Sequence, residues 1–174
     1  LGLAIILISI IMAVMFTSWR MVLLSIIPNV IPLIFTAAIM GFTGIPIKAS
    51  TILVFSIAFG ISVDNTIHFL AKYRQELKLT GWNIGRSVIL ALHETGVSML
   101  YTAVVLFFGF GIFSLSGFGG TVALGVLVSL TLLVALTANL ILLPSLLMGL
   151  DRLTTTSNFE KPMLEIYDED AEIE

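Results

Sequence analysis

The sequence contains no cysteine and only two histidines, His68 and His93, which lie far apart in the chain. The missing cysteines exclude a disulfide framework and a thiolate metal site, and two distant histidines do not make a zinc site. Charged residues make up only 11% of the 174 residues, against about a quarter in a typical soluble domain. No nucleophile–base pair or phosphate-binding loop is visible, so we expect no enzyme activity, no cofactor, no metal and no nucleic-acid partner.

Apolar residues make up 58% of the chain, and its mean hydropathy is +1.12. The sequence therefore predicts an all-α, polytopic membrane protein. Long apolar runs predict five transmembrane helices, each of about the 17–25 residues that a bilayer requires or somewhat more. They lie at about residues 1–18, 21–42, 49–70, 97–115 and 121–149. Residues 1–150 thus form one transmembrane domain, and the acidic tail at 151–174 is expected to have little structure of its own.

The basic residues predict the orientation of the spans. The side that holds the Trp19-Arg20 turn, residues 71–96 and the tail carries seven of the eight basic residues, and Lys48 alone lies on the other side. The positive-inside rule makes the seven-residue side cytoplasmic, which places the C-terminus in the cytosol. The chain begins inside an apolar run without a methionine, and we interpret it as the C-terminal part of a longer polypeptide.

Residues 82–95, "WNIGRSVILALHET", differ from the spans. Apolar residues recur there at helical spacing, whereas Arg86, His93 and Glu94 lie mostly off that stripe. The pattern favours a short amphipathic helix at the cytoplasmic interface. A connector packed on the bundle is the alternative.

Asp64 stands within the third predicted span, in "GISVDNTIHFL". It precedes Lys72, the first basic residue on the cytoplasmic side, by eight residues, so it lies roughly 12 Å inside that boundary. A charge at this depth costs about 3 kcal/mol or more, and such residues face a bundle interior and are usually functional. A carboxyl group removed from water favours its neutral form, which lets it take up a proton from one side and release it to the other. We predict that Asp64 is a proton relay. The structural alternative is an Asp64 that stays protonated or hydrogen-bonded and holds neighbouring helices together.

The neighbours of Asp64 on its own helix share its face. Ser56, Gly60, Asp64 and His68 follow at intervals of four, and Gly60 lets a neighbouring helix approach closely. Asn65 lies at the edge of the same face and is predicted to stand beside Asp64 in the relay. His68 is close to the interface, where a cap or a headgroup contact is the favoured role and a place in the relay is the alternative.

Polar residues of two further spans are expected at a similar depth. Ser98 and Thr102 share one face of the fourth span, and Thr102 lies roughly 8 Å from its cytoplasmic end. The fifth span adds Thr137 and Asn139. The sequence predicts that these residues converge, with Thr102 in the relay and with Ser98 and Asn139 in support.

Pro28, Asn29 and Pro32, in "IIPNVIP", are expected to break the second span. Proline removes backbone hydrogen bonds and bends a helix. A hinge or access pathway and a static kink at Pro28 and Pro32 both remain open.

Four stretches carry a resemblance to a known family: "SWRMVLLSIIPNVIPLIFTAAIMGFTGIPI", "STILVFSIAFGISVDNTIHFLAKYRQE", "ALHETGVSMLYTAVVLFFGFGIF" and "FGGTVALGVLVSLTLLVALTANLILLPSLL". They cover most of residues 17–148, and the second, with Gly-x-x-x-Asp before "IHFLAKYR", is the most specific. The sequence resembles the resistance-nodulation-division superfamily, most closely its MMPL/Patched-like branch of bacterial exporters.

The resemblance implies a larger architecture. Members have two halves of six helices, each with a large extracytoplasmic domain after its first helix. The five spans here match the last five helices of the C-terminal half and also resemble a sterol-sensing domain. The implied partners are membrane lipids, a hydrophobic substrate, and the N-terminal half and extracytoplasmic domain of the same polypeptide. A homo-oligomer remains open.

The resemblance also implies a mechanism. Members couple proton entry to export through an acidic residue, which corresponds to Asp64, and a facing hydroxyl, which corresponds to Thr102. Relatives often have a second aspartate or an aromatic residue where Asn65 stands. Because asparagine carries no titratable charge, a relay of two carboxylates within this half is not available.

Three interpretations follow. The first is a proton-driven exporter of lipids or other hydrophobic compounds in the bacterial inner membrane. The second is a sterol-sensing-like module that binds lipid and regulates without transport. The third is a purely structural assembly subunit.

Overall fold

The computed structural model describes residues 2, 10 and 19–149, and the part from 19 onward is a helical bundle without strands. Its helices are α2 (Trp19–Thr43), α3 (Ala49–Leu79), α4 (Ile84–Gly111), the 3₁₀-helix η1 (Ile112–Leu115), α5 (Gly119–Thr137), the π-helix η2 (Ala138–Leu142) and α6 (Leu143–Gly149). The all-α fold is therefore confirmed. The first predicted span, at 1–18, and the acidic tail, at 151–174, lie outside the described residues.

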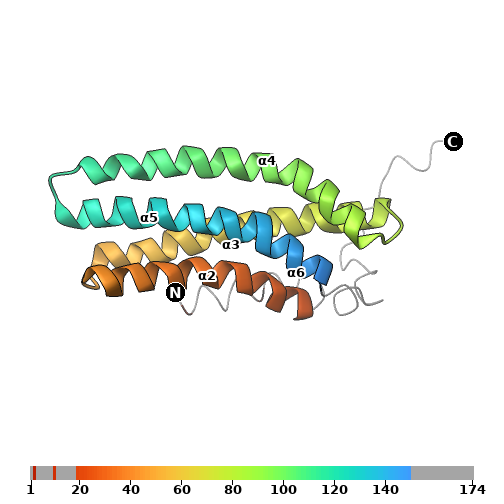
Figure 1. Cartoon of the computed structure of the whole chain (residues 1–174), viewed down its shortest axis with the longest axis horizontal. Coiled ribbons are helices and arrows are strands. Elements are labelled where there is room, and N and C mark those ends of the chain that lie inside the picture. The colour runs from red at the N-terminus through yellow and green to blue at the C-terminus, as the bar shows by residue number, and fades with distance from the viewer. Residues whose placement is uncertain (1, 3–9, 11–18, 150–174) are drawn as a thin grey trace.

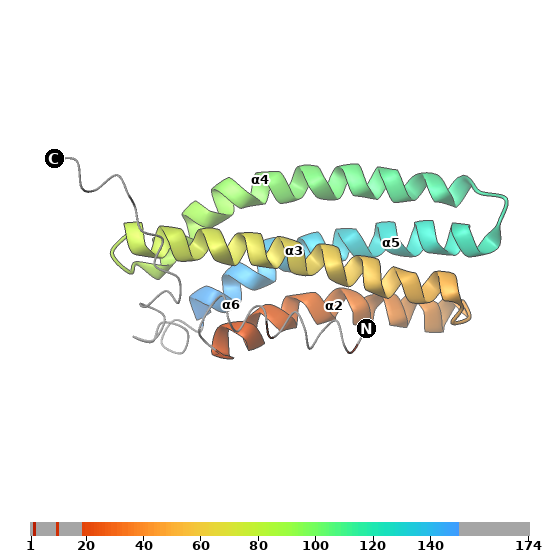
Figure 2. The same cartoon turned by 180° about the vertical axis from the view of Figure 1, so that it is seen from behind.

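Successive long helices run in opposite directions and form an up-and-down bundle (Figure 1). Helices α3 and α5 each contact the three other long helices, whereas α2 and α4 flank them. Seen from behind, α3 crosses in front of α5 (Figure 2). The α2–α3 turn uses Gly44 at φ +69°, a conformation that glycine adopts without steric cost.

Four stretches of the described part are long and apolar enough to cross a membrane. They are Leu24–Thr43, Ala49–Leu79, Ile84–Leu115 and Gly119–Gly149. Each corresponds to one of the last four predicted spans. The chain is thus a multi-pass membrane protein, although the count of five spans depends on residues that the structure does not describe.

Two predicted boundaries differ from the observed ones. Trp19 and Arg20, read as a turn, already belong to α2. Helix α3 begins at Ala49 as predicted but continues nine residues beyond Leu70, to Leu79. The extension, "AKYRQELKL", is rich in strong helix formers, and Tyr73 in it is buried. The hydropathy pattern marked where the apolar span ends and not where the helix ends.

Residues 84–95 are not a separate amphipathic helix. They form the first turns of α4, which continues without interruption to Gly111. Gly96 allows this continuity at a tight contact, because a Cβ atom there would lie 3.3 Å from Leu140. Whether these turns lie in a membrane interface stays a prediction.

The prolines of the second span do not break it. Pro28 and Pro32 both lie inside α2, which is helical from Trp19 to Thr43. Nearby side chains bond the helix backbone: the Ser25 and Thr36 hydroxyls donate to carbonyl oxygens one turn earlier, at 2.6 and 2.8 Å. Proline is tolerated inside membrane-spanning helices, and α2 continues through both prolines.

The last span changes its helical register near the middle. In η2 the N–H of Leu143 donates to the carbonyl of Ala138, five residues earlier. Pro144 follows immediately, has no N–H, and its ring would collide with the carbonyl four residues before it. A wide π turn relieves this collision, and π turns inside helices are frequent at functional sites.

Candidate functional site

One face of α3 carries the predicted stripe. Ser56, Gly60, Asp64 and His68 are all exposed on the described chain. The Asp64 side chain is 69% exposed, and its Oδ1 lies 3.5 Å from Nε2 of His68, one turn along the same helix. The structure therefore brings together Asp64 and His68, and no other described helix supplies an ion-pair partner to this carboxylate.

Gly60 does not serve a contact inside the described bundle. A Cβ atom built there would meet nothing within 4 Å among the described residues. The described residues therefore do not make the close approach predicted for Gly60.

An ion pair fixes the register of α3 against α4. Nζ of Lys72 lies 2.6 Å from Oε2 of Glu94. Asp64 lies about two turns before Lys72 on α3, and Thr102 lies about two turns after Glu94 on α4. Because the two helices are antiparallel, Asp64 and Thr102 lie at the same level of the bundle. The predicted match in depth thus agrees with the register.

The Thr102 hydroxyl makes no bond to Asp64. It is exposed and donates to the carbonyl of Ser98, one turn earlier in α4, at 3.0 Å. Asn65, by contrast, is buried at 8% exposure and makes no hydrogen bond to another described residue.

A buried polar cluster lies on the opposite face of α3. Asn29 of α2, Ser62 and Thr66 of α3, and Asn139 of η2 are each at most 1% exposed. The Ser62 hydroxyl donates to Oδ1 of Asn29 at 2.6 Å. Nδ2 of Asn139 lies 3.3 Å from both the hydroxyl and the carbonyl of Ser62. Neutral side chains of three helices thus satisfy one another where no water is at hand.

Thr66 occupies the centre of the polar cluster. Its Oγ1 lies 2.7 Å from Oδ1 of Asn139, 3.1 Å from Oδ1 of Asn29 and 3.0 Å from the carbonyl of Ser62. A hydroxyl carries one hydrogen, so Thr66 can donate to only one of these three acceptors at a time. The cluster therefore has more than one way to arrange its hydrogen bonds.

The sequence predicted a site role for only one member of this cluster, Asn139. Asn139 was expected near Asp64 and Thr102, but it bonds Thr66 on the other side of α3. Asn29 was interpreted as a helix breaker. Ser62 and Thr66 were missed, although their spacing of four residues within an apolar span was the available signal.

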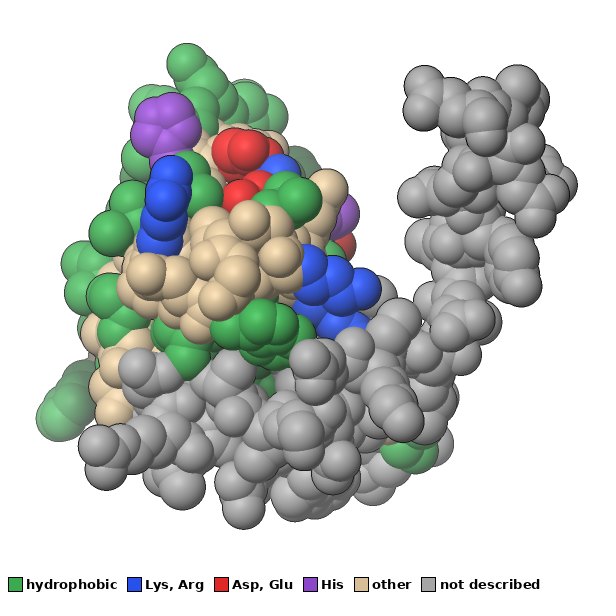
Figure 3. All heavy atoms as spheres, turned by 90° about the vertical axis from the view of Figure 1, so that its right-hand side faces the viewer, with side chains coloured by type: hydrophobic (Ala, Val, Ile, Leu, Met, Phe, Trp, Pro, Cys, Tyr) green, Lys and Arg blue, Asp and Glu red, His purple; other side chains and the backbone are tan. Residues whose placement is uncertain are grey.

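Charged side chains gather at the end of the bundle where α3 turns into α4. Figure 3 faces this end, where Lys and Arg, Asp and Glu, and His side chains lie together. Lys72 bonds Glu76 at 3.0 Å as well as Glu94. A short bond between the hydroxyls of Thr80 and Ser87, at 2.5 Å, closes the turn. This end is tied together by polar contacts, as expected outside the hydrocarbon.

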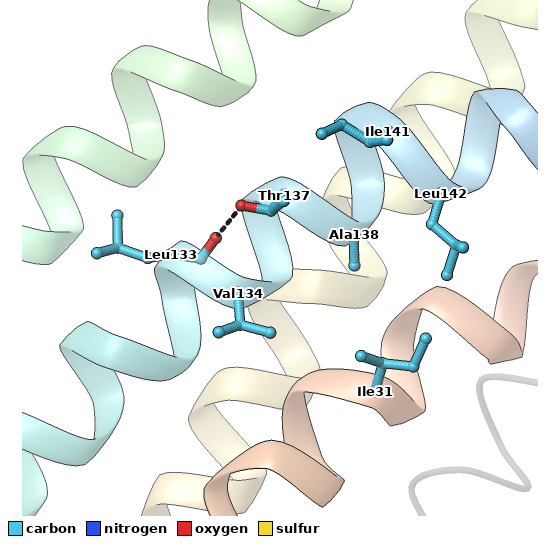
Figure 4. A pocket seen from close by; sticks show the side chains of 7 residues that line it. All are labelled: Ile31, Leu133, Val134, Thr137, Ala138, Ile141 and Leu142. Atoms are coloured by element: carbon cyan, nitrogen blue, oxygen red, sulfur yellow. Dashed lines mark hydrogen bonds between the residues drawn. The ribbon is translucent and has the colours of Figure 1, made fainter.

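An apolar pocket of about 400 Å³ lies between α2 and the last span (Figure 4). The hydroxyl of Thr137 points along its own helix and donates to the carbonyl of Leu133, so it is not free to bind a ligand strongly. The lining is otherwise aliphatic: Ile31, Leu133, Val134, Ala138, Ile141 and Leu142. Because η2 contributes to both features, the pocket lies next to the polar cluster.

Comparison with known proteins agrees with this architecture. The model of the MMPL family matches residues 1–161. The chain belongs to the MMPL family. An MMPL-family match over nearly the whole chain agrees with the apolar spans of the structure.

One relative of the MMPL chain comes from Methanocaldococcus jannaschii. It is MJ1562, whose name describes it only as a membrane protein, and it is 28% identical over 88 residues. The match covers 51% of this chain and 22% of the relative, so the chain spans a minor part of that protein's length. No solved structure matches.

Proposed function

We propose that this MMPL-family chain is the transmembrane part of an exporter that moves lipids or other hydrophobic compounds out of the cell and draws on the proton-motive force. The protein lies in the bacterial inner membrane with the end of this chain in the cytoplasm. The exporter functions together with a second transmembrane half and an extracytoplasmic domain. Asp64 is its proton-coupling group.

The exposure of Asp64 is the observation that carries this proposal. The buried polar cluster on the opposite face of α3 forms its hydrogen bonds without Asp64, whose only described ion-pair partner is a histidine on the same helix. A carboxylate that holds helices together would contact a second helix. Asp64 instead belongs to a face that needs a covering segment or a water path, because a charge facing hydrocarbon is costly.

The residues around Asp64 suit proton exchange. His68, at 3.5 Å, can stabilise the carboxylate when the imidazole is protonated. Thr102 lies at the level of Asp64, and rotation of its side chain would redirect its hydroxyl from the Ser98 carbonyl toward a bound water. The amide of Asn65 has no described partner and can bond the same water.

The test is transport by the full-length protein in vesicles with an imposed pH gradient, using a fluorescent lipid as the substrate probe. Asp64→Asn keeps the shape of the side chain and removes its titratable proton. We expect this variant to insert and fold like the wild type and to lose gradient-driven transport. Transport that continues at the wild-type rate in Asp64→Asn would refute the role of this residue.

The apolar pocket favours a second candidate function, a sterol-sensing-like module that binds lipid without transport. Its volume of about 400 Å³ is within the range of small-molecule sites, about 300–1,000 Å³. Under this alternative, Asp64→Asn is nearly silent. Ala138→Leu, which narrows the pocket, would then abolish the lipid response.

A further inference from the structure

We propose that Asn29, Ser62, Thr66 and Asn139 are positioning residues that hold α3 in the rotation presenting Asp64 on the exposed face. This inference rests on the proposed role of Asp64. It adds a second set of residues, on the far side of the same helix, through which the state of Asp64 is communicated to α2 and η2.

The geometry of α3 links the two sets. Ser62 and Thr66 lie two residues before and two residues after Asp64, which places them about 160° around the helix from it. A rotation of α3 that moves Asp64 into a new environment must therefore move both hydroxyls. Their bonds to Asn29 at 2.6 Å and to Asn139 at 2.7 Å cannot both survive such a rotation.

The cluster is also suited to exchange between arrangements. Thr66 has three acceptors within 3.1 Å and one hydrogen, so it can change partner with little loss of bonding. Asn139 stands in a π turn, in which the backbone register is already altered. A segment with two discrete bonding patterns is what a coupling element requires.

Titratable groups near α3 are few. On α3 itself His68 lies next to Asp64. The other titratable groups of this helix lie toward the charged end: Lys72, Tyr73, Arg74, Glu76 and Lys78. On α4, Tyr101 adjoins Thr102, and His93 and Glu94 lie toward the charged end. Within the described part, α2 beyond Arg20 and the whole stretch from α5 to α6 carry no titratable side chain. The polar cluster itself is uncharged, so any effect of its residues on a pH profile must act through another group.

The experiment reads the rotation of α3 through a thiol at Ser56. Ser56→Cys is nearly isosteric, is exposed on the same stripe as Asp64, and would be the only cysteine among the 174 residues of this chain. Any cysteine elsewhere in the full-length protein is first replaced by serine. The rate of labelling by a small thiol reagent in vesicles is measured from pH 5 to 8. This profile is compared in backgrounds with Thr66→Val, Thr66→Ser and, as a matched control, Thr95→Val, whose hydroxyl bonds only the carbonyl of Ala91 in its own helix.

Loss of the Thr66 hydroxyl weakens the described rotation, in which Asp64 is exposed and to which the proposal assigns the ionised carboxylate. Removal of one such hydrogen bond changes the equilibrium between two helix rotations roughly three- to tenfold. We therefore expect the midpoint of the labelling profile to move up by about 0.5–1 pH unit. Thr66→Ser should restore the wild-type midpoint, and Thr95→Val should leave it unchanged. If Thr66→Val does not fold, Ser62→Ala serves in its place with the same expected shift.

Two negative results are distinct. A pH-dependent profile that is the same with Thr66→Val as without it overturns the positioning role and leaves Asp64 as the coupling group. A wild-type profile that does not depend on pH, or one that persists in Asp64→Asn, removes the proposed coupling role and this inference with it.

Discussion

Helix α5 passes close to the end of α4 at Gly125, and a methyl group added there should destabilise the bundle. In Gly125→Ala the new Cβ would lie 2.7 Å from the carbonyl oxygen of Phe110 and 2.8 Å from Cβ of Phe113. Ordinary contact begins at 3.4 Å, so the two helices must separate by about 0.7 Å. Because the first of these neighbours is backbone, no side chain can move aside to relieve the clash.

The cost can be worked from this geometry. Overpacking of this kind costs about 1–3 kcal/mol. The bond from Ser129, one turn on from Gly125, to the carbonyl of Phe107 spans the same interface at 3.0 Å and would lengthen, which costs about 0.6 kcal/mol. The higher helix propensity of alanine offsets up to about 1 kcal/mol of this destabilisation. We expect a net loss of about 1–2 kcal/mol in the free energy of unfolding.

The assay is unfolding in mixed micelles by increasing amounts of a denaturing detergent, followed by circular dichroism. Gly109→Ala is the matched control, because it makes the same change in α4 at a position where a Cβ meets nothing within 4 Å among the described residues. The control should be neutral or slightly stabilising. Equal stability of Gly125→Ala and wild type, or an equal loss in both variants, would show that the helices do not pack as described.

Three further predictions concern polar contacts. Glu94→Gln removes one partner of Lys72, so it should lower the detergent midpoint of unfolding at low salt, and the difference should vanish near 1 M salt, where screening acts within about 3 Å. Thr66→Val should lower the free energy of unfolding by about 0.6–1.7 kcal/mol in the same assay, whereas Thr95→Val should change it little; equal effects would contradict a central place for Thr66. Asn139→Leu should cost about 1–3 kcal/mol, because the buried hydroxyls that it leaves behind lose a partner, and a variant as stable as wild type would count against the polar cluster.

Much of the fold could be predicted because hydropathy in a membrane protein reflects one dominant force. The apolar runs at 21–42, 49–70, 97–115 and 121–149 are each helical for nearly all of their length in the structure. Spacing alone also predicted the shared face of Asp64 and His68, since helical periodicity needs no tertiary information.

The parts that were wrong depend on packing between segments distant in sequence. The extension of α3 beyond Leu70 is held by burial of residues such as Tyr73, which hydropathy in a window does not detect. The prolines were expected to break α2, but the helix continues through both of them. The polar cluster was missed because its hydrogen bonds join segments that are distant in the sequence. Thr66 lies on the face of α3 opposite Asp64, and its partners lie on α2 and η2.

The central claim is that Asp64 gains and loses a proton as the exporter works, and infrared difference spectroscopy of the full-length protein tests it most directly. A pH step across oriented membranes should produce a change in the carboxyl C=O band that is present in the wild type and absent in Asp64→Asn. A difference spectrum that is the same in both proteins would contradict the account, because Asp64 would then keep one protonation state throughout.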